Sequence, residues 1–268
     1  MDPNGREPFD SRFKAAVERN FDQSAQAYDL FEGKHHLFET LTQKQLELIE
    51  PSRPERILDV GCGTGISTLA LHKSLAGRSP NIYAIDISEA MLHQAKERCR
   101  KVKGVYFVRG DAENLEAYFH EAFDAIFYTA SVFLLPRFAD SIRQASRLLL
   151  PGGVLSISYY SGLFTSEGED AIRKTFPDLK YQYGAFPIHE LLACLDSLHE
   201  YRTTKVDLRF EATREFLFDF LSIPAQSAGL FPKVPYLERI PMVRDLCASL
   251  EGKAGPIYMG WKVLIARK

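Results

Sequence analysis

The chain has 268 residues, of which 46% are hydrophobic and 25% charged, and its formal net charge is −2. This composition is typical of a globular protein, and the length is enough for one sizeable core in one or two domains. Because no long basic block is present, the sequence lacks the electrostatic footprint of nucleic-acid binding, and we expect no nucleic-acid partner.

The cysteines are widely spaced and lack the paired spacing of a zinc site; they are Cys62, Cys99, Cys194 and Cys247. They indicate free thiols in a reducing compartment and no bound metal. The first 20 residues are polar and charged, without the apolar core of a signal peptide. No window approaches the roughly 18 apolar residues of a membrane span. We therefore predict a cytoplasmic protein.

The spacing of apolar residues predicts helices within the first 50 residues. Residues 1–12 look disordered or loosely attached, whereas residues 13–31 carry apolar side chains at helical spacing. A second helix is expected over residues 34–50 and ends before Pro51. We interpret residues 1–50 as an N-terminal helical cap.

From residue 51 onward, short apolar strands alternate with helices. Strands are predicted over residues 56–61, 81–88, 105–112, 123–132 and 154–160, and helices over residues 66–77, 88–102, 115–118 and 137–153. Strict alternation with apolar strands favours an α/β fold, in which helices cover both faces of a parallel sheet.

After residue 160 the alternation loosens. An irregular insertion (161–187), a helix (189–200), a strand (203–211), a partly helical insertion (212–255) and a last strand (257–268) follow in that order. We treat residues 51–268 as one domain and expect both insertions to cover the substrate. Tyr181, Tyr183 and Phe186 favour an aromatic or apolar small-molecule acceptor. The segment FLFDFL (216–221) is apolar enough either to line a pocket or to pack in the core.

A glycine loop, Gly61-Cys62-Gly63-Thr64-Gly65, follows the first predicted strand. Such a loop lets a ligand approach the backbone near a helix N-terminus. Its spacing is GxGxG, whereas dinucleotide enzymes use GxGxxG to hold a pyrophosphate. Asp59, beside the loop, would repel a pyrophosphate and favour a ligand with a cationic amine or sulfonium. The loop therefore disfavours an NAD-dependent oxidoreductase.

Two further carboxylates end the next two predicted strands. Asp86 can accept hydrogen bonds from both ribose hydroxyls, and the following Ile87 can cover a purine face. Asp111 can accept a hydrogen bond from an exocyclic amine. Each acid taken alone can be a helix N-cap, but three acids at successive strand ends favour a ligand site. The ligand implied is an adenosine with a positive, non-phosphorylated tail, which describes S-adenosylmethionine.

ILDVGCGTG (57–65) resembles the first motif of class I S-adenosylmethionine-dependent methyltransferases. IYAIDIS, VRGDAENL, FDAIFYTASVFLL and LLLPGGVLSIS resemble the later motifs of that superfamily, in order. The resemblance implies a Rossmann-like, seven-stranded, mostly parallel sheet, with the last strand antiparallel between the fifth and sixth. It implies cofactor binding by Tyr28, Asp59, Gly61, Cys62, Gly63, Gly65, Asp86, Ile87, Asp111, Ala112 and Thr129.

VERNFDQSAQAYD (17–29) resembles the N-terminal segment of two groups in this superfamily, the ubiquinone/menaquinone-type methyltransferases and the malonyl-acyl-carrier-protein methyltransferases of biotin synthesis. The resemblance implies that this helix lies over the cofactor and that Tyr28 reaches the methionine end. The C-terminal YMGWKVLIARK looks more like the biotin-pathway type. In the loop after the fourth strand, Thr129 and Phe133 stand where many relatives have asparagine and histidine.

Methyl transfer from a sulfonium is an in-line displacement, so the protein mainly supplies position and electrostatics. A general base is needed only when the acceptor must lose a proton. The sequence therefore identifies no catalytic residue; the weak candidates are His35, His36 and Tyr159, which can equally be exposed histidines and a pocket wall.

The leading hypothesis is a methyltransferase that uses S-adenosylmethionine and a small-molecule acceptor. One alternative is an acyl acceptor presented by a carrier protein, and another is a non-catalytic S-adenosylmethionine-binding module. The sequence indicates neither the acceptor atom nor the oligomeric state.

Overall fold

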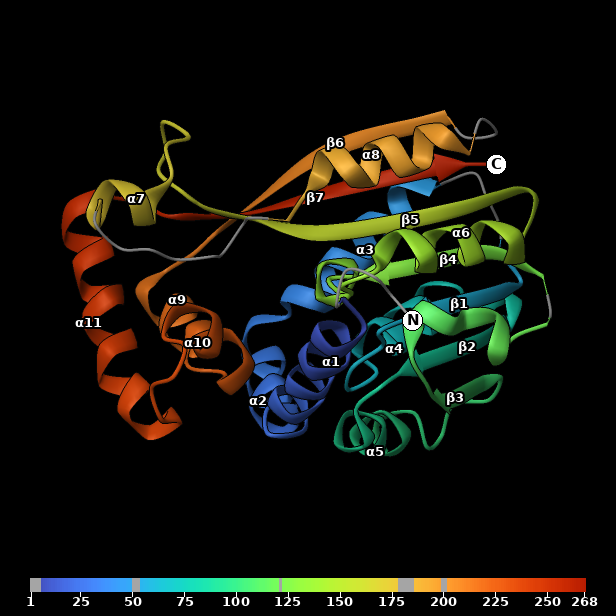
Figure 1. Cartoon of the computed structure of the whole chain (residues 1–268), viewed down its shortest axis with the longest axis horizontal. Helices are drawn as coiled ribbons and strands as arrows, with labels where there is room; N and C mark the ends of the chain where they lie inside the picture. The colour runs from blue at the N-terminus through green and yellow to red at the C-terminus, as the bar shows by residue number, and fades with distance from the viewer. Residues whose placement is uncertain (1–5, 50–53, 121, 178–185, 199–201) are drawn as a thin grey trace.

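The computed structural model describes residues 6–49, 54–120, 122–177, 186–198 and 202–268. Figure 1 shows an α/β lobe built on the sheet and a helical lobe into which the last strands of the sheet extend. The helical lobe consists of α7 (Ala171–Thr175), α9 (Arg214–Leu221), α10 (Pro224–Leu230) and α11 (Tyr236–Ala254). No helix in the described ranges is long and apolar enough to cross a membrane.

In the described part of the chain, seven strands form one sheet. They are β1 (Arg56–Val60), β2 (Asn81–Asp86), β3 (Val105–Arg109), β4 (Phe123–Thr129), β5 (Leu149–Phe164), β6 (Arg202–Glu211) and β7 (Tyr258–Arg267). Their order is β3-β2-β1-β4-β5-β7-β6. The first five strands pair in parallel, and β7 is antiparallel to both β5 and β6. The predicted fold class, including the antiparallel last strand, is confirmed.

Some helices flank the sheet, and three others come before its first strand in the sequence. Those of the α/β lobe are α4 (Ile66–Ser74), α5 (Glu89–Arg98), α6 (Phe138–Leu148) and α8 (Ile188–Ser197), with short 3₁₀ turns η1 (Ala76–Arg78), η2 (Ala112–Ala117) and η3 (Val132–Leu134). The N-terminal helices are α1 (Arg6–Asp22), α2 (Ala25–His35) and α3 (Leu37–Ile49).

The N-terminal segment differs from its prediction in two ways. Helix α1 already begins at Arg6, so the predicted loose attachment of residues 1–12 is wrong from residue 6 onward; residues 1–5 lie outside the described part of the chain. The predicted helix 13–31 is divided at Gln23 and Ser24. The Ser24 hydroxyl donates to the Asn20 carbonyl (2.6 Å) and accepts the Ala225 N–H (2.9 Å), so a contact from α10 fixes the break.

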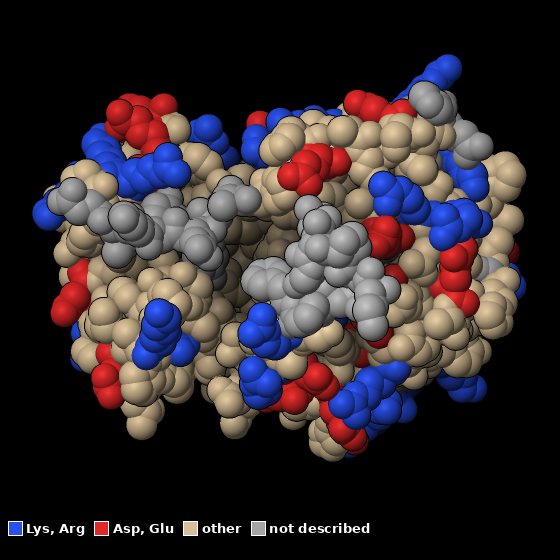
Figure 2. Space-filling view, in the orientation of Figure 1, with Lys and Arg blue, Asp and Glu red and all other residues tan. Residues whose placement is uncertain are grey.

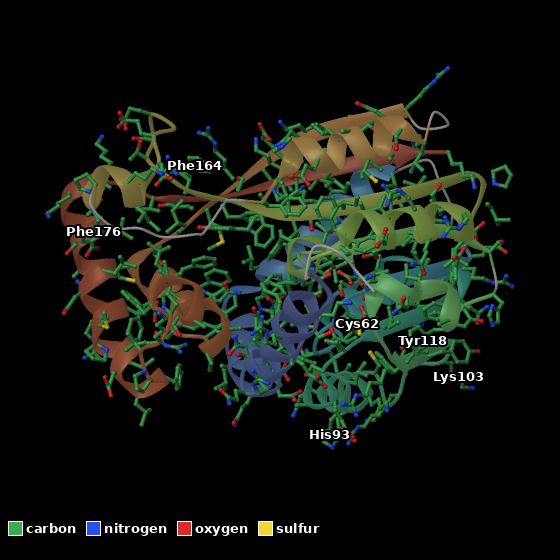
Figure 3. All side chains as sticks on the ribbon, viewed as in Figure 1. Cys62, His93, Lys103, Tyr118, Phe164 and Phe176 are labelled. Atoms are coloured by element: carbon green, nitrogen blue, oxygen red, sulfur yellow. The ribbon has the colours of Figure 1, made fainter. Side chains whose placement is uncertain are left out.

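Strand β5 is longer than its prediction because β7 supplies it with partners. Pairing continues past Tyr160, through a bulge, to Phe164 opposite Tyr258. The first residues of the predicted irregular insertion 161–187 are therefore strand. The ring of Phe164 packs against Gly260, where an added Cβ would lie 2.5 Å from that ring. Figure 3 shows Phe164 and Phe176 in the helical lobe, and Cys62 in the α/β lobe.

The core lies on both faces of the sheet, as expected for parallel strands. In β4, Ala125 and Phe127 belong to one hydrophobic cluster and Ile126 and Tyr128 to the other. The first cluster also contains side chains of α2, α3 and the helical lobe. The cap, the helical lobe and one face of the sheet thus share a core, and the division of the chain at residue 50 stays a prediction.

Leu41 tests whether α3 is part of this shared core, because its side chain is fully buried. We expect Leu41→Ala to lower the free energy of unfolding by about 2–5 kcal/mol. Leu48→Ala, on the half-buried face of the same helix, should cost about 1 kcal/mol. Urea unfolding followed by the fluorescence of Trp261, the single tryptophan, measures both. Equal effects would show that α3 packs only loosely on the sheet.

Candidate active site

A cavity of about 690 Å³ lies at the carboxyl ends of β1, β2 and β4 and beside the turn that follows β3. Open α/β sheets bind their ligands at the carboxyl ends of the strands. Its lining includes Gly61, Cys62, Gly63, Asp86, Ile87, Asp111, Ala112 and Thr129. The structure thus brings together most of the residues predicted to bind a cofactor. Figure 2 shows that one face of the molecule is hollowed between the two lobes.

The three glycines of the loop all have positive φ, 73°, 54° and 79° for Gly61, Gly63 and Gly65. An added Cβ at Gly61 would lie 2.5 Å from the Ser131 Cβ, and one at Gly65 would lie 3.0 Å from Ala95. Gly63 has no atom within 4 Å of such a Cβ. Gly61 and Gly65 are therefore needed for close packing, while Gly63 leaves open space beside the backbone.

Asp86 ties this loop to the end of β2. Its Oδ2 accepts the Gly63 N–H at 2.8 Å, and its Oδ1 accepts the Ser88 N–H at 2.9 Å. Burial raises the pKa of Asp86 above its ordinary value, although these N–H groups oppose the shift. A carboxylate has about four acceptor sites, so two remain for ribose hydroxyls.

Asp111 caps the 3₁₀ turn η2 and also pairs with the ammonium group of Lys14. Its Oδ1 accepts the Glu113 N–H at 2.9 Å as the N-cap of η2, and its Oδ2 accepts from the Lys14 ammonium at 2.7 Å. Lys14 also pairs with the buried Glu113 carboxylate. The acid predicted to receive an adenine amine is thus bonded to a lysine of α1.

Helix α1 covers the cavity and places Phe13, Val17 and Phe21 in its lining. Besides Lys14, Glu18 pairs with Arg109 (3.0 Å), and Asp22 accepts the Ser88 hydroxyl (2.6 Å). These contacts hold α1 along the strand ends.

Tyr28 of α2 also lines the cavity and accepts a hydrogen bond from the Gln226 amide of α10 at 2.5 Å. Burial raises the pKa of Tyr28, so its phenol is neutral at physiological pH.

Asp59, in β1, and Gly65, at the end of the glycine loop, lie outside the lining. Asp59 is fully buried, and its Oδ2 accepts the hydroxyls of Ser67 and Thr68, each at 2.7 Å. Its Oδ1 has no hydrogen-bond partner among the described residues. Burial raises the pKa of Asp59 to about 6, with the two hydroxyls opposing the shift. A buried carboxylate with an unpaired oxygen is complementary to a nearby cation.

The three weak catalytic candidates also lie outside the lining. His35 Nε2 is hydrogen-bonded to Asp219 of α9 at 2.8 Å, and His36 Nδ1 contacts Glu39 at 3.1 Å. Tyr159 belongs to the core cluster on the opposite face of β5, whereas its neighbour Tyr160 lines the cavity. Adjacent side chains of a strand point to opposite faces of the sheet, so Tyr160 faces the cavity and Tyr159 faces the other core cluster.

Beyond the glycine loop, the cavity has an aromatic wall formed by Phe38, Phe133, Tyr160, Phe186, Phe220 and Trp261. Of these, Phe186 was predicted to form the pocket, and Phe220 lies in the segment FLFDFL. Tyr160 ends the predicted strand 154–160, and Phe133 lies in the loop after the fourth strand, where many relatives have a histidine. Phe38 and Trp261 were missed, because residues of α3 and β7 meet only through the fold. Tyr181 and Tyr183, also predicted here, lie outside the described residues.

The raised pKa of Asp59 predicts a pH dependence of stability. Because this pKa of about 6 lies above the unfolded value of about 3.9, protonated Asp59 favours the folded state. That contribution is complete below the unfolded pKa and is lost as the pH rises through about 6. Asp59→Asn should therefore gain stability relative to wild type between about pH 4 and pH 6, by up to about 3 kcal/mol. Urea unfolding of both proteins across this range measures the difference; a constant difference would contradict the prediction.

Comparison with known proteins gives relatives that match a little more than half of the chain. A malonyl-[acyl-carrier protein] O-methyltransferase of Halalkalibacterium halodurans is 31% identical over 155 residues, which cover 55% of each chain. A demethylmenaquinone methyltransferase of Staphylococcus aureus is 29% identical over 147 residues, covering 53% of this chain and 59% of the relative. The matches thus span little more than half the length of these relatives.

Solved structures match over more of the chain, at lower identity. The [4+2]-cyclase SpnF superimposes with a TM-score of 0.61 and 22% identity over 94% of both chains. A phosphoethanolamine N-methyltransferase of Haemonchus contortus, solved with S-adenosylhomocysteine, superimposes with a TM-score of 0.57 and 16% identity, covering 92% of this chain and 57% of that one. At such identities the likeness establishes the fold alone, and a fold hosts different reactions.

A family model described as a methyltransferase domain matches residues 51–202, more than half of the chain. The predicted resemblance to class I S-adenosylmethionine-dependent methyltransferases is confirmed, and the chain belongs to the methyltransferase domain family.

Proposed function

We propose that this protein is an S-adenosylmethionine-dependent methyltransferase that acts on an aromatic or apolar small molecule. One observation carries the proposal: a single cavity joins the glycine loop and two strand-end carboxylates to an aromatic wall. A cofactor site and an acceptor site are then continuous, as direct transfer between two bound molecules requires.

At the cofactor end, Asp86 would hold the ribose, Ile87, Asp111 and Ala112 the adenine, and the loop backbone from Gly61 to Gly63 the thioether side. Tyr28 would lie at the methionine end, and Thr129 between that end and the aromatic wall. The unpaired Asp59 oxygen fits the positive charge of this cofactor. When bound, the cofactor supplies a methyl group already activated for displacement.

At the acceptor end, the cavity is apolar. Its charged lining residues among those described are Lys14, Asp86 and Asp111, and Lys14 is already paired with Asp111. The wall therefore favours an aromatic or apolar acceptor and excludes water from the reacting atoms. No histidine is present among the described lining residues, so the proposal assigns the chain the task of positioning and names no base.

An acyl group on a carrier protein is the second candidate acceptor, because the first relative above is named for such a substrate. A malonyl carboxylate would meet an aromatic wall with no unpaired cation among the described lining residues, which favours the small-molecule proposal. Turnover only with an acylated carrier would reverse this preference. The cytoplasmic location and the catalytic candidates His35, His36 and Tyr159 stay predictions.

Calorimetric titration with S-adenosylhomocysteine tests the cofactor assignment. We expect Asp86→Ala to weaken binding roughly 100-fold or more, because two hydrogen bonds from the ribose to a carboxylate are lost. Asp124→Ala is the matched control, since Asp124 also accepts two backbone N–H groups, from Glu55 and Arg56. Asp124 lies at the amino end of β4, away from the cavity. Asp124→Ala should bind as wild type does.

NADH serves as the ligand control in the same titration. Binding of NADH alone, or unchanged affinity for S-adenosylhomocysteine in Asp86→Ala, would refute the assignment of this site. Binding of S-adenosylhomocysteine without methyl transfer to any acceptor would leave a binding module in place of an enzyme.

A further inference from the structure

Gln45 is a fully buried polar residue of α3 that contacts two neighbouring strands. Its Nε2 donates to Ser156 at 2.9 Å. Its Oε1 accepts the hydroxyls of Thr129 at 3.0 Å and of Ser158 at 3.1 Å. The N-terminal cap thus reaches into the end of β4 and the adjoining part of β5.

These hydrogen bonds fix the direction of each hydroxyl. A hydroxyl has one hydrogen, and Thr129 and Ser158 both donate theirs to Gln45. Ser158 in turn accepts the Ala130 N–H at 3.1 Å. Thr129, which lines the cavity, can therefore offer a ligand only its oxygen lone pairs.

The backbone beside Thr129 is held in an unusual conformation. Ala130 has a φ of 55°, which is rare for a residue with a Cβ. Ser158 holds its N–H, and the next residue, Ser131, donates its hydroxyl to the Val60 carbonyl at 2.6 Å. Local strain that is fixed from several sides is typical of a functional site.

Thr129 lies between the two ends of the cavity. Ser131, two residues on, packs against Gly61 of the glycine loop. On β5, Ser158 pairs with Thr129, and Tyr160 of the aromatic wall follows Ser158 on the same face. A group bound at Thr129 is thus near both the loop and the wall.

We propose that Gln45 is a positioning residue that makes Thr129 a hydrogen-bond acceptor, and that Thr129 selects acceptor molecules with a hydroxyl or N–H group on an aromatic or apolar body. The inference rests on the proposed function and narrows its substrate class. It concerns recognition, and it assigns no proton transfer to Thr129.

Two probes with the same naphthalene body test the inference, 2-naphthol and its methyl ether, 2-methoxynaphthalene, which lacks the donor and carries one more methyl group. Their dissociation constants are measured by ligand fluorescence with the full chain saturated with S-adenosylhomocysteine. We expect wild type to bind 2-naphthol about threefold to tenfold more tightly, the worth of one neutral hydrogen bond.

The variants separate positioning from packing. Thr129→Val and Gln45→Leu should abolish the preference, and Thr129→Ser should retain it. Ser156→Ala is the matched control, because it removes a Gln45 contact on the side away from Thr129 and should leave the preference intact. Urea unfolding followed by Trp261 fluorescence, measured for each variant, shows that the chain is folded.

A preference that persists in Thr129→Val, or that disappears in Ser156→Ala, would overturn the inference. So would a wild-type protein that binds S-adenosylhomocysteine but neither naphthalene, or both equally. Failure of wild type to bind S-adenosylhomocysteine would instead overturn the proposed function, so the two failures are distinguishable.

Discussion

The proposed cofactor end of the site depends on one half-buried carboxylate, that of Asp86. Both oxygens of Asp86 are bonded to backbone N–H groups, one in the glycine loop and one at the start of α5. A buried carboxylate without such donors would be costly, so the loop and the helix have to take up these positions together. Gly65 then packs on Ala95 of α5, and Ser88 of the same turn bonds to α1. The positions of the glycine loop, α5 and α1 thus depend on the hydrogen bonds at the end of β2.

Charge explains why such a loop does not mark a phosphate site. Asp59 lies in β1 one residue before its end, Asp86 ends β2, and Asp111 follows β3. Lys14 is the one cation among the described lining residues, and it is paired with Asp111. A pyrophosphate would be repelled, whereas a ligand with a positive tail is attracted. One of these acids also attaches α1, because Lys14 of α1 pairs with Asp111 and with the neighbouring Glu113. In the proposed site, the adenine amine and α1 therefore share the Asp111 carboxylate.

Local patterns were enough to predict the sheet, the glycine loop and the acids at the strand ends, because each follows from residues close in sequence. Features that need distant partners were predicted poorly. The break at Ser24 depends on Ala225, and the length of β5 depends on β7. Tyr159 and Tyr160 both end the predicted fifth strand, and only the fold shows that Tyr160 lines the cavity, because adjacent side chains of a strand point to opposite faces. Trp261 and Phe38 lie in predicted elements but entered no prediction of the pocket, because their shared pocket exists only in the folded chain.

The N-terminal helices α1 and α2 are joined to α10 of the helical lobe. Ser24, between α1 and α2, accepts the Ala225 N–H, and Tyr28 of α2 accepts a hydrogen bond from the Gln226 amide. Ala225 and Gln226 both line the cavity, so these hydrogen bonds connect the N-terminal helices with a helix that lines the same cavity. The strand ends below are held separately, because Gln45 bonds to Thr129 and Asp86 bonds to the glycine loop. The contacts that join α2 to α10 are therefore distinct from those that position Thr129 and the loop.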